Sequence, residues 1–132
     1  KSWFGEASFE RGQLICGDFN VAPHENDVWN HKQLLRVVSH TPVETQALDE
    51  LLSGGHGWVD LVRKHHPYDQ KLYSWWSYRS PNWLAADKGR RLDHVWATGD
   101  VAAHCTSAEI FKVVRGWGKQ PSDHVPVLTR FW

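Results

Sequence analysis

The sequence LICGDFN, residues 14–20, determines how the rest of the chain is interpreted. Its first three residues are apolar and predict a short buried strand, which Gly17 ends. Asp18 and Asn20 follow at once, and in open α/β sheets ligands collect at the carboxyl ends of the strands. A carboxylate there is a candidate general base or metal ligand, and an amide can hold an anionic oxygen. The alternative is an ordinary turn, because Gly, Asp and Asn all favour turns.

The composition is that of one globular domain, residues 1–132, which is long enough for a hydrophobic core. The 15 Lys and Arg residues equal the 15 Asp and Glu residues, so overall charge does not point to a nucleic-acid partner. The sequence has no apolar run of membrane-spanning length and no signal-peptide pattern. It begins at Lys1 and contains no Met, so we expect a piece of a longer protein.

The two cysteines, Cys16 and Cys105, lack the spacing of a zinc site or a disulfide scaffold. Cys16 lies within the apolar run, so we expect it to be a buried free thiol. Unpaired cysteines fit a reducing compartment, which favours a cytoplasmic protein.

The clearest helix is expected over residues 42–53. Thr41 is a suitable N-cap, Pro42 suits the first helical position, and Glu44 completes a T-x-x-E capping box. An apolar stripe that includes Leu48 predicts one buried face, and two glycines follow the last turn.

Elsewhere the sequence indicates strands and short helical pieces. We expect the end of a helix and a turn at residues 1–12, a polar loop at 19–28, a short helix within 29–38, a strand or helix at 58–62, and strands at 13–17, 72–78, 91–97, 108–114 and 125–132. Many strands with one long helix predict an α/β fold, a sheet covered by helices on one face.

Three acid-containing stretches stand beside or within these strands. Asp18 and Asn20 follow the first strand, Asp93 lies inside a strand-like run, and Asp123 and His124 precede the last strand. Taken singly, each is more typical of a turn. Asp is uncommon in strands and a half-buried carboxylate needs a partner, so we expect Asp93 to pair with His124.

Four motifs carry a family resemblance: GDFN at 17–20, YSWWSYR at 73–79, GRRLDH at 89–94 and SDHVPV at 122–127. In this order they resemble the exonuclease III family of AP endonucleases, within the endonuclease/exonuclease/phosphatase superfamily. GDxN and SDH occur across the superfamily, whereas WWxYR and RxD are typical of the DNA-repair branch. The resemblance implies the C-terminal half of a DNase I-like four-layer α/β sandwich, mostly antiparallel or mixed in its sheet.

The resemblance assigns roles to the polar residues. It implies that Asp18 orients or deprotonates the attacking water and that Asn20 contacts the scissile phosphate. It implies that Asp93 orients His124, which contacts the phosphate and stabilises the transition-state charge. Asp123 would lie at a divalent-metal site, and Mg²⁺ or Mn²⁺ suits such oxygen ligands.

The resemblance also indicates how DNA would be held. Trp75 is similar to the aromatic wall of the pocket that receives a flipped abasic sugar, with Leu92 near it. Arg79, Arg90 and Arg91 are expected to contact backbone phosphates, which position DNA without reading its sequence. The position of Arg90 is often apolar in relatives, so an arginine there alters part of the pocket.

The first half of the family fold, with its own metal ligands, is absent from this sequence. A sheet face that meets this N-terminal half in the family would then be exposed, and two copies could pair through it as a homodimer.

Three functions remain open. The first is a DNA-repair nuclease, bacterial-type, cytoplasmic and nucleoid-associated, that needs a divalent metal and cleaves double-stranded DNA 5′ to abasic sites and at 3′ ends, with 3′-5′ exonuclease and 3′-phosphatase activity. The second is a catalytically incomplete module that only binds DNA or dimerises. The third is a superfamily phosphatase acting on a small phosphoester, against which the residue 75–79 motif argues.

Overall fold

The structure is a computed structural model that describes residues 12–132. The helix end expected over residues 1–12 therefore lies outside the described residues, Gly12 excepted. The strands are β1 (Leu14–Asp18), β2 (Trp58–Asp60), β3 (Trp75–Trp76), β4 (Gly89–Arg90), β5 (Asp93–Thr98), β6 (Cys105–Ile110) and β7 (Val127–Phe131). The helices are α2 (His31–Leu34), α3 (Pro42–Ser53), α4 (Leu61–His65), α5 (Trp83–Ala86) and α6 (Gly99–Ala102), with short 3₁₀ turns η1 (Glu25–Asp27) and η2 (Lys112–Gly116).

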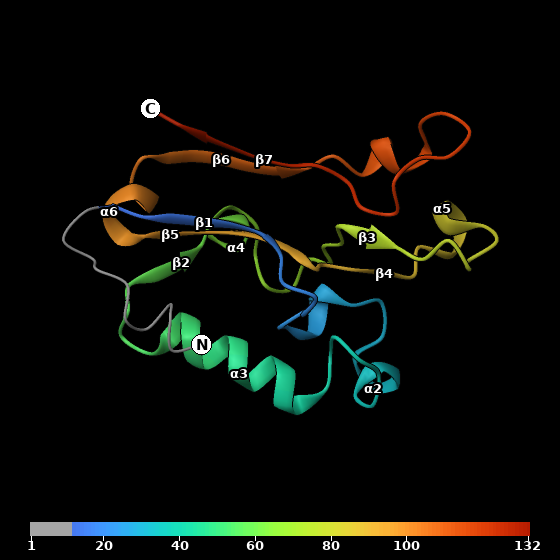
Figure 1. The fold of residues 1–132 in the computed structure, drawn as a ribbon, viewed down its shortest axis with the longest axis horizontal. Helices are drawn as coiled ribbons and strands as arrows, with labels where there is room; N and C mark the ends of the chain where they lie inside the picture. Colours follow the sequence, from blue (N-terminus) through green and yellow to red (C-terminus); the bar gives the residue numbers. More distant parts are fainter. Residues whose placement is uncertain (1–11) are drawn as a thin grey trace.

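The strands pair antiparallel in three small sheets, ordered β1-β5-β2, β3-β4 and β6-β7 (Figure 1). This mixed α/β architecture confirms the predicted fold class. In the central sheet, Asp18 at the end of β1 lies opposite Asp93 at the start of β5. The antiparallel register therefore brings these two carboxylates together, rather than the shared carboxyl edge of a parallel sheet.

Helix α3 has the bounds that the sequence predicted. Its Leu48 packs with Trp58 and Trp96 on one face of the central sheet. The cap differs from the expected box, because Thr41 makes no side-chain bond to the helix backbone. Instead the hydroxyl of Thr41 donates to Glu44 Oε1 at 2.6 Å, while Glu44 accepts the backbone N–H of Ser39 at 2.9 Å.

The opposite face of the central sheet packs against other elements. Successive side chains of a strand point to opposite faces, so Trp96 meets α3 while Val95 and Ala97 meet Leu61 of α4 and Ala102 of α6. Figure 1 shows α3 below this sheet and the β6-β7 sheet above it. Helix α4 also joins the core beneath β6 and β7. Helices thus pack on both faces of the central sheet, which differs from the predicted covering on one face, because both faces of β5 carry apolar side chains.

Strand β1 is not the buried strand that the sequence predicted. It is an edge strand, with Leu14 43% exposed and Cys16 exposed, so the expected burial of the Cys16 thiol is wrong. Leu128 and Phe131 of β7 are 37% and 41% exposed. Leu128 and Phe131 are three residues apart and so point to opposite faces of β7, and the expected large uncovered apolar face stays a prediction.

Two other predicted strands are shorter or displaced. The aromatic run at 72–78 forms a strand only at Trp75–Trp76, and the strand expected at 108–114 ends at Ile110, where the chain turns into η2. The segment 58–62 was expected to be either a strand or a helix. It contains both, because strand β2 leads directly into helix α4. Within residues 12–132, no helix combines the length and apolar character needed to cross a membrane.

Candidate active site

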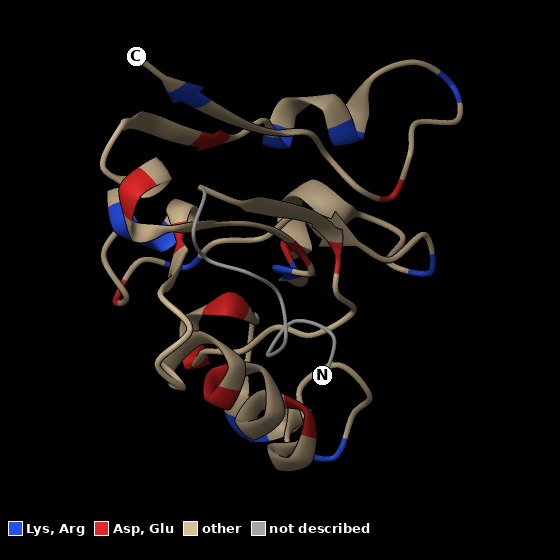
Figure 2. Cartoon of the chain, turned by 60° about the vertical axis from the view of Figure 1, so that its left-hand side comes forward, with Lys and Arg blue, Asp and Glu red and all other residues tan. Residues whose placement is uncertain are grey.

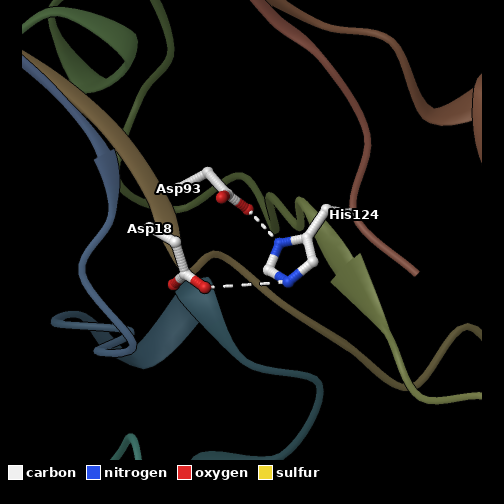
Figure 3. A group of neighbouring side chains, drawn as sticks. All are labelled: Asp18, Asp93 and His124. Carbon is white, nitrogen blue, oxygen red and sulfur yellow. Dashed lines mark hydrogen bonds and ion pairs between the residues drawn. The ribbon is translucent and has the colours of Figure 1, made fainter. Parts of the chain in front are cut away.

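Three distant segments bring together Asp18, Asp93 and His124 (Figure 3). Asp18 ends β1, Asp93 begins β5, and His124 lies in the loop before β7. The Nδ1 atom of His124 lies 2.8 Å from Asp93 Oδ2, and its Nε2 atom lies 3.7 Å from Asp18 Oδ2. The structure therefore confirms the predicted pairing of Asp93 with His124 and adds Asp18 on the other side of the ring.

The protonation of His124 follows from this geometry. Partial burial lowers its pKa, but the hydrogen bond to Asp93 and the negative charges of Asp93, Asp18 and Asp123 outweigh burial and raise the pKa above its ordinary value. An Nδ1–H donated to Asp93 leaves Nε2 facing Asp18. The ring is thus held in one orientation and favoured in its charged form.

Ser74 holds Asp93 in place, and sequence reasoning missed it. Its hydroxyl donates to Asp93 Oδ2 at 2.7 Å and accepts the backbone N–H groups of Leu92 and Asp93, each at 3.0 Å. Ser74 is fully buried. The available signal was a small hydroxyl residue inside the aromatic YSWWSYR run, where a packing role alone would favour an apolar residue.

Asn20 lies beside these groups in a strained backbone conformation, with a φ of 54°. Its backbone N–H donates to Asp18 Oδ1 at 2.8 Å, so the turn itself orients the carboxylate. Asn20 and His124 line a cavity of about 470 Å³, which we call the site cavity. Its other lining residues are Val38, Ser39, Trp75, Arg90 and Leu92.

Trp75 connects this cavity to Asp123. Its Nε1–H donates to Asp123 Oδ2 at 3.0 Å, and the other oxygen of Asp123 lies 4.0 Å from His124 Nε2. Trp75 also forms a backbone bridge with His124 and pairs with Arg90 across β3 and β4. The structure thus places Trp75, Asp123 and the buried Leu92 around the same site.

Arg90 lies in the wall of the site cavity. Its guanidinium carbon is 5.2 Å from the centre of the Trp75 ring, and Nη1 donates to the carbonyl of Val38 at 3.1 Å and to Ser39 Oγ at 3.0 Å. Burial lowers the pKa of Arg90. Arg79, by contrast, is exposed and lines a neighbouring cavity with Arg90.

Arg91 does not contact DNA in this fold, and its expected role is wrong. Its side chain is fully buried, and it forms ion pairs with Asp27 at 2.7 Å and Asp60 at 2.8 Å. Arg63 adds a 2.6 Å pair to Asp27, which completes a four-residue buried ion cluster. The polar loop expected at 19–28 is therefore tied into the core at Asp27 instead of being solvated.

The charges within the buried ion cluster balance, two carboxylates against two guanidinium groups. Burial raises the pKa of Asp27 and of Asp60, but the charge and hydrogen bonds of Arg91 outweigh burial and lower both pKa values. Arg91 thereby ties the η1 turn, through Asp27, to the end of β2, through Asp60, and β2 pairs with β5.

The site residues suit a hard divalent cation. Asp18, Asp93 and His124 each place one ligand atom within 4.8 Å of the others, and Asp123 turns one oxygen toward the same ring nitrogen. Mg²⁺ typically takes one or two carboxylates and completes its shell with water and substrate phosphate. Asp18 and Asp123 supply such carboxylates, whereas Asp93 and His124 already bond one another.

Comparison with known proteins places the chain in a family. The model of the endonuclease/exonuclease/phosphatase family matches residues 3–124. Exodeoxyribonuclease III of Haemophilus influenzae is 32% identical over 124 residues, which are 89% of this chain and 45% of that protein. The exodeoxyribonuclease of Bacillus subtilis is 32% identical over 128 residues, which are 96% of this chain and 47% of that protein.

Solved structures show the same partial overlap. An AP endonuclease from Archaeoglobus fulgidus superposes with a TM-score of 0.88 at 30% identity, over 97% of this chain and 48% of its own. A 3′ phosphatase, NExo, from Neisseria, bound to a product DNA hairpin, gives a TM-score of 0.86 at 27% identity, over 98% of this chain and 48% of its own. The chain spans about half the length of these relatives. The chain belongs to the endonuclease/exonuclease/phosphatase family, where its relatives are exodeoxyribonucleases and AP endonucleases.

Proposed function

We propose that this chain forms the catalytic half of a DNA-repair nuclease that hydrolyses phosphodiester bonds 5′ to abasic sites, with 3′-5′ exonuclease and 3′-phosphatase activity. One observation carries the proposal: an imidazole held between Asp93 and Asp18, beside the cavity that Asn20 also lines. An unreactive surface histidine does not require a carboxylate on each ring nitrogen. The family match and the nuclease relatives support the reaction class.

The residues divide the work of phosphodiester hydrolysis. Asp18 accepts a proton from the attacking water, because its carboxylate faces the site and Asn20 fixes its orientation. The side chain of Asn20 and the charged ring of His124 donate to the phosphoryl oxygens, where negative charge increases in the transition state. Asp93 and Ser74 keep the imidazole aligned throughout. Phosphoryl transfer needs little beyond such positioning and charge stabilisation.

A divalent cation completes this chemistry. Asp123 and Asp18 would hold Mg²⁺ or Mn²⁺, which when bound supplies charge neutralisation on the phosphate and acidifies a water molecule. The N-terminal half of the family fold would supply the remaining ligands of this cation.

The proposed partners are double-stranded DNA and the N-terminal half of the same fold. Exposed apolar side chains on β1 and β7, among them Leu14 and Leu128, are candidate contacts for such a half. A second copy of the chain is the alternative occupant. Sedimentation of the chain alone tests this, since a monomer at micromolar concentration contradicts self-pairing.

The experiment that tests the function is nicking of a duplex with one tetrahydrofuran abasic analogue, in Mg²⁺ and in EDTA. We expect metal-dependent nicking when the N-terminal half is supplied, and loss of at least about a thousandfold in Asp18→Asn, because the general base and a metal ligand are removed together. Asp49→Asn, an exposed carboxylate on α3, is the matched control. Equal nicking by Asp18→Asn and Asp49→Asn would contradict the proposed role of Asp18.

A further inference from the structure

A second cavity, of about 630 Å³, adjoins the site cavity and is used by no step described above. The two cavities share Trp75 and Arg90 in their walls. The second cavity adds Trp29, Arg79 and Lys88, together with small polar residues and a proline. Its lining thus holds three cations and no carboxylate, in a chain whose formal net charge is zero.

Two of the three cations in this cavity, Lys88 and Arg90, lie over aromatic rings. The Nζ atom of Lys88 lies 4.8 Å from the centre of the Trp29 ring, much as Arg90 lies over Trp75. Among the described residues, none of Arg79, Lys88 and Arg90 forms an ion pair with a carboxylate. Figure 1 places β3 and β4, which build this cavity, at the opposite end of the molecule from α6, and α3 with its acidic residues (red in Figure 2) runs along a separate layer.

The backbone connects the cavity directly to the catalytic histidine. Val28 bridges to Arg90, Arg90 pairs with Trp75, and Trp75 bridges to His124. Trp29 is secured next to this row by its backbone N–H, which donates to the carbonyl of Gly89 at 3.2 Å. This row of backbone pairs links the second cavity to the part of the site cavity beside His124.

We propose that this cavity binds an unpaired, base-bearing nucleotide at the 3′ end of the DNA strand. The base stacks on the face of Trp29 that Lys88 covers in this structure, so Lys88 must leave the ring, and Lys88 and Arg79 then hold the adjoining phosphate. Aromatic rings with a cationic track are the arrangement by which proteins hold single-stranded nucleic acid. Arg90 and Trp75 together form the partition between this nucleotide and the scissile phosphate beside His124.

This inference rests on the proposed nuclease function and refines its substrate. A base-free sugar has no flat ring to stack on Trp29, so it leaves this part of the cavity unmatched. A frayed or mispaired 3′ terminus supplies both the ring and the phosphate. For the 3′-5′ exonuclease activity, this cavity therefore favours 3′ ends whose last nucleotide carries a base.

The test is direct binding in EDTA, so that it does not depend on catalysis. Fluorescence anisotropy compares labelled duplexes that differ only at the 3′ end: an unpaired nucleotide with its base, a tetrahydrofuran residue at the same place, and a blunt end. We expect the base-bearing end to bind about fivefold or more tightly than the base-free end, as stacking on an aromatic ring provides. Trp29→Phe should keep this preference and Trp29→Leu should abolish it.

Circular dichroism shows whether Trp29→Leu folds. Variants of the cations test the inference independently if it does not. Lys88→Ala and Arg79→Ala remove exposed cations from the cavity and should weaken binding of the base-bearing end by about threefold or more. Lys32→Ala, an exposed lysine of α2 outside both cavities, is the matched control and should leave binding unchanged. Equal affinity for the base-bearing and base-free ends, or equal effects of Lys88→Ala and Lys32→Ala, overturns the inference but leaves the proposed function standing. Failure to bind any of the duplexes contradicts both.

Discussion

Two clusters of carboxylates and cations in this chain differ in burial and in charge balance. In the buried ion cluster, Arg91 pairs with Asp27 and Asp60, and every charge is cancelled inside the core. In the candidate active site, Asp18 and Asp93 flank a single His124 on the surface, and negative charge exceeds positive. The same residue types therefore stabilise the fold where charges balance away from water, and remain available for a cation or a phosphate where they do not.

The largest expected effect comes from breaking the buried ion cluster. Arg91→Met removes the ion-pair partner of Asp60 and one of the two partners of Asp27, since among the described residues Arg63 forms an ion pair with Asp27 but not with Asp60. Removing one member of a buried pair costs about 3–5 kcal/mol, so we expect the free energy of unfolding to fall by that amount in urea titrations. Arg36→Met, at an exposed arginine, should change it by less than about 0.5 kcal/mol. Similar losses in both variants would show that the cluster is not stabilising.

The second effect is the pH dependence of stability that follows from the burial of His94. The pKa of the buried His94 is lowered from 6.5 to about 4, first by burial and then by the charge of Arg91, while Asp60 opposes the shift. Between these two pKa values the unfolded chain binds a proton that the folded chain does not, so stability is complete above pH 6.5 and falls as the pH drops toward 4. The pKa difference corresponds to about 3 kcal/mol.

The measurement is urea unfolding at pH 7 and pH 4.5 for the unmodified chain and His94→Gln. The pKa values of His24 and His40 are also lowered by burial, so they contribute to the acid sensitivity of both proteins. We expect the unfolding free energy of His94→Gln to depend less steeply on pH than that of the unmodified chain. Identical pH dependence would mean that His94 is accessible to protons in the folded state.

A smaller effect is expected where the two regions meet, at Ser74. Ser74→Ala removes the hydroxyl that serves Asp93 and the backbone N–H groups of Leu92 and Asp93, and leaves those groups without that partner. We expect a loss of about 1–3 kcal/mol in unfolding free energy. Ser53→Ala, at an exposed hydroxyl that bonds a helix carbonyl, is the control and should have little effect. Equal stability of the two variants would mean that Asp93 finds another donor.

The smallest effect concerns a single proton in the candidate site. Asp93→Asn removes the hydrogen bond and the charge that raise the pKa of His124, so this pKa should fall. Titration of the imidazole by NMR measures the change without any need for activity. Asp49→Asn should leave the titration of His124 where it is, and an unchanged value in Asp93→Asn would contradict the assigned pairing.

Much of the candidate site followed from the sequence. The motifs located Asp18, Asn20, Asp93 and His124, and the requirement of a half-buried carboxylate for a partner predicted the Asp93–His124 pair that the structure contains. Ser74 could not be assigned in this way, because its role depends on β3 lying beside the start of β5. The residues next to Ser74 in the sequence do not indicate that its hydroxyl bonds Asp93.

The sequence by itself determined the features that arise within one segment. Helix α3 begins at Pro42 and ends at Ser53 as predicted, because its cap, its apolar stripe and its glycine stop all lie within a few residues of one another. Only the tertiary structure decided which of two adjacent arginines meets solvent. Arg90 lines the site cavity and Arg91 is buried with Asp27 and Asp60, because successive residues of an extended chain point to opposite sides and distant segments supply the partners. The exposure of Cys16 has the same origin, since burial depends on what packs against a strand and not on the strand's own composition.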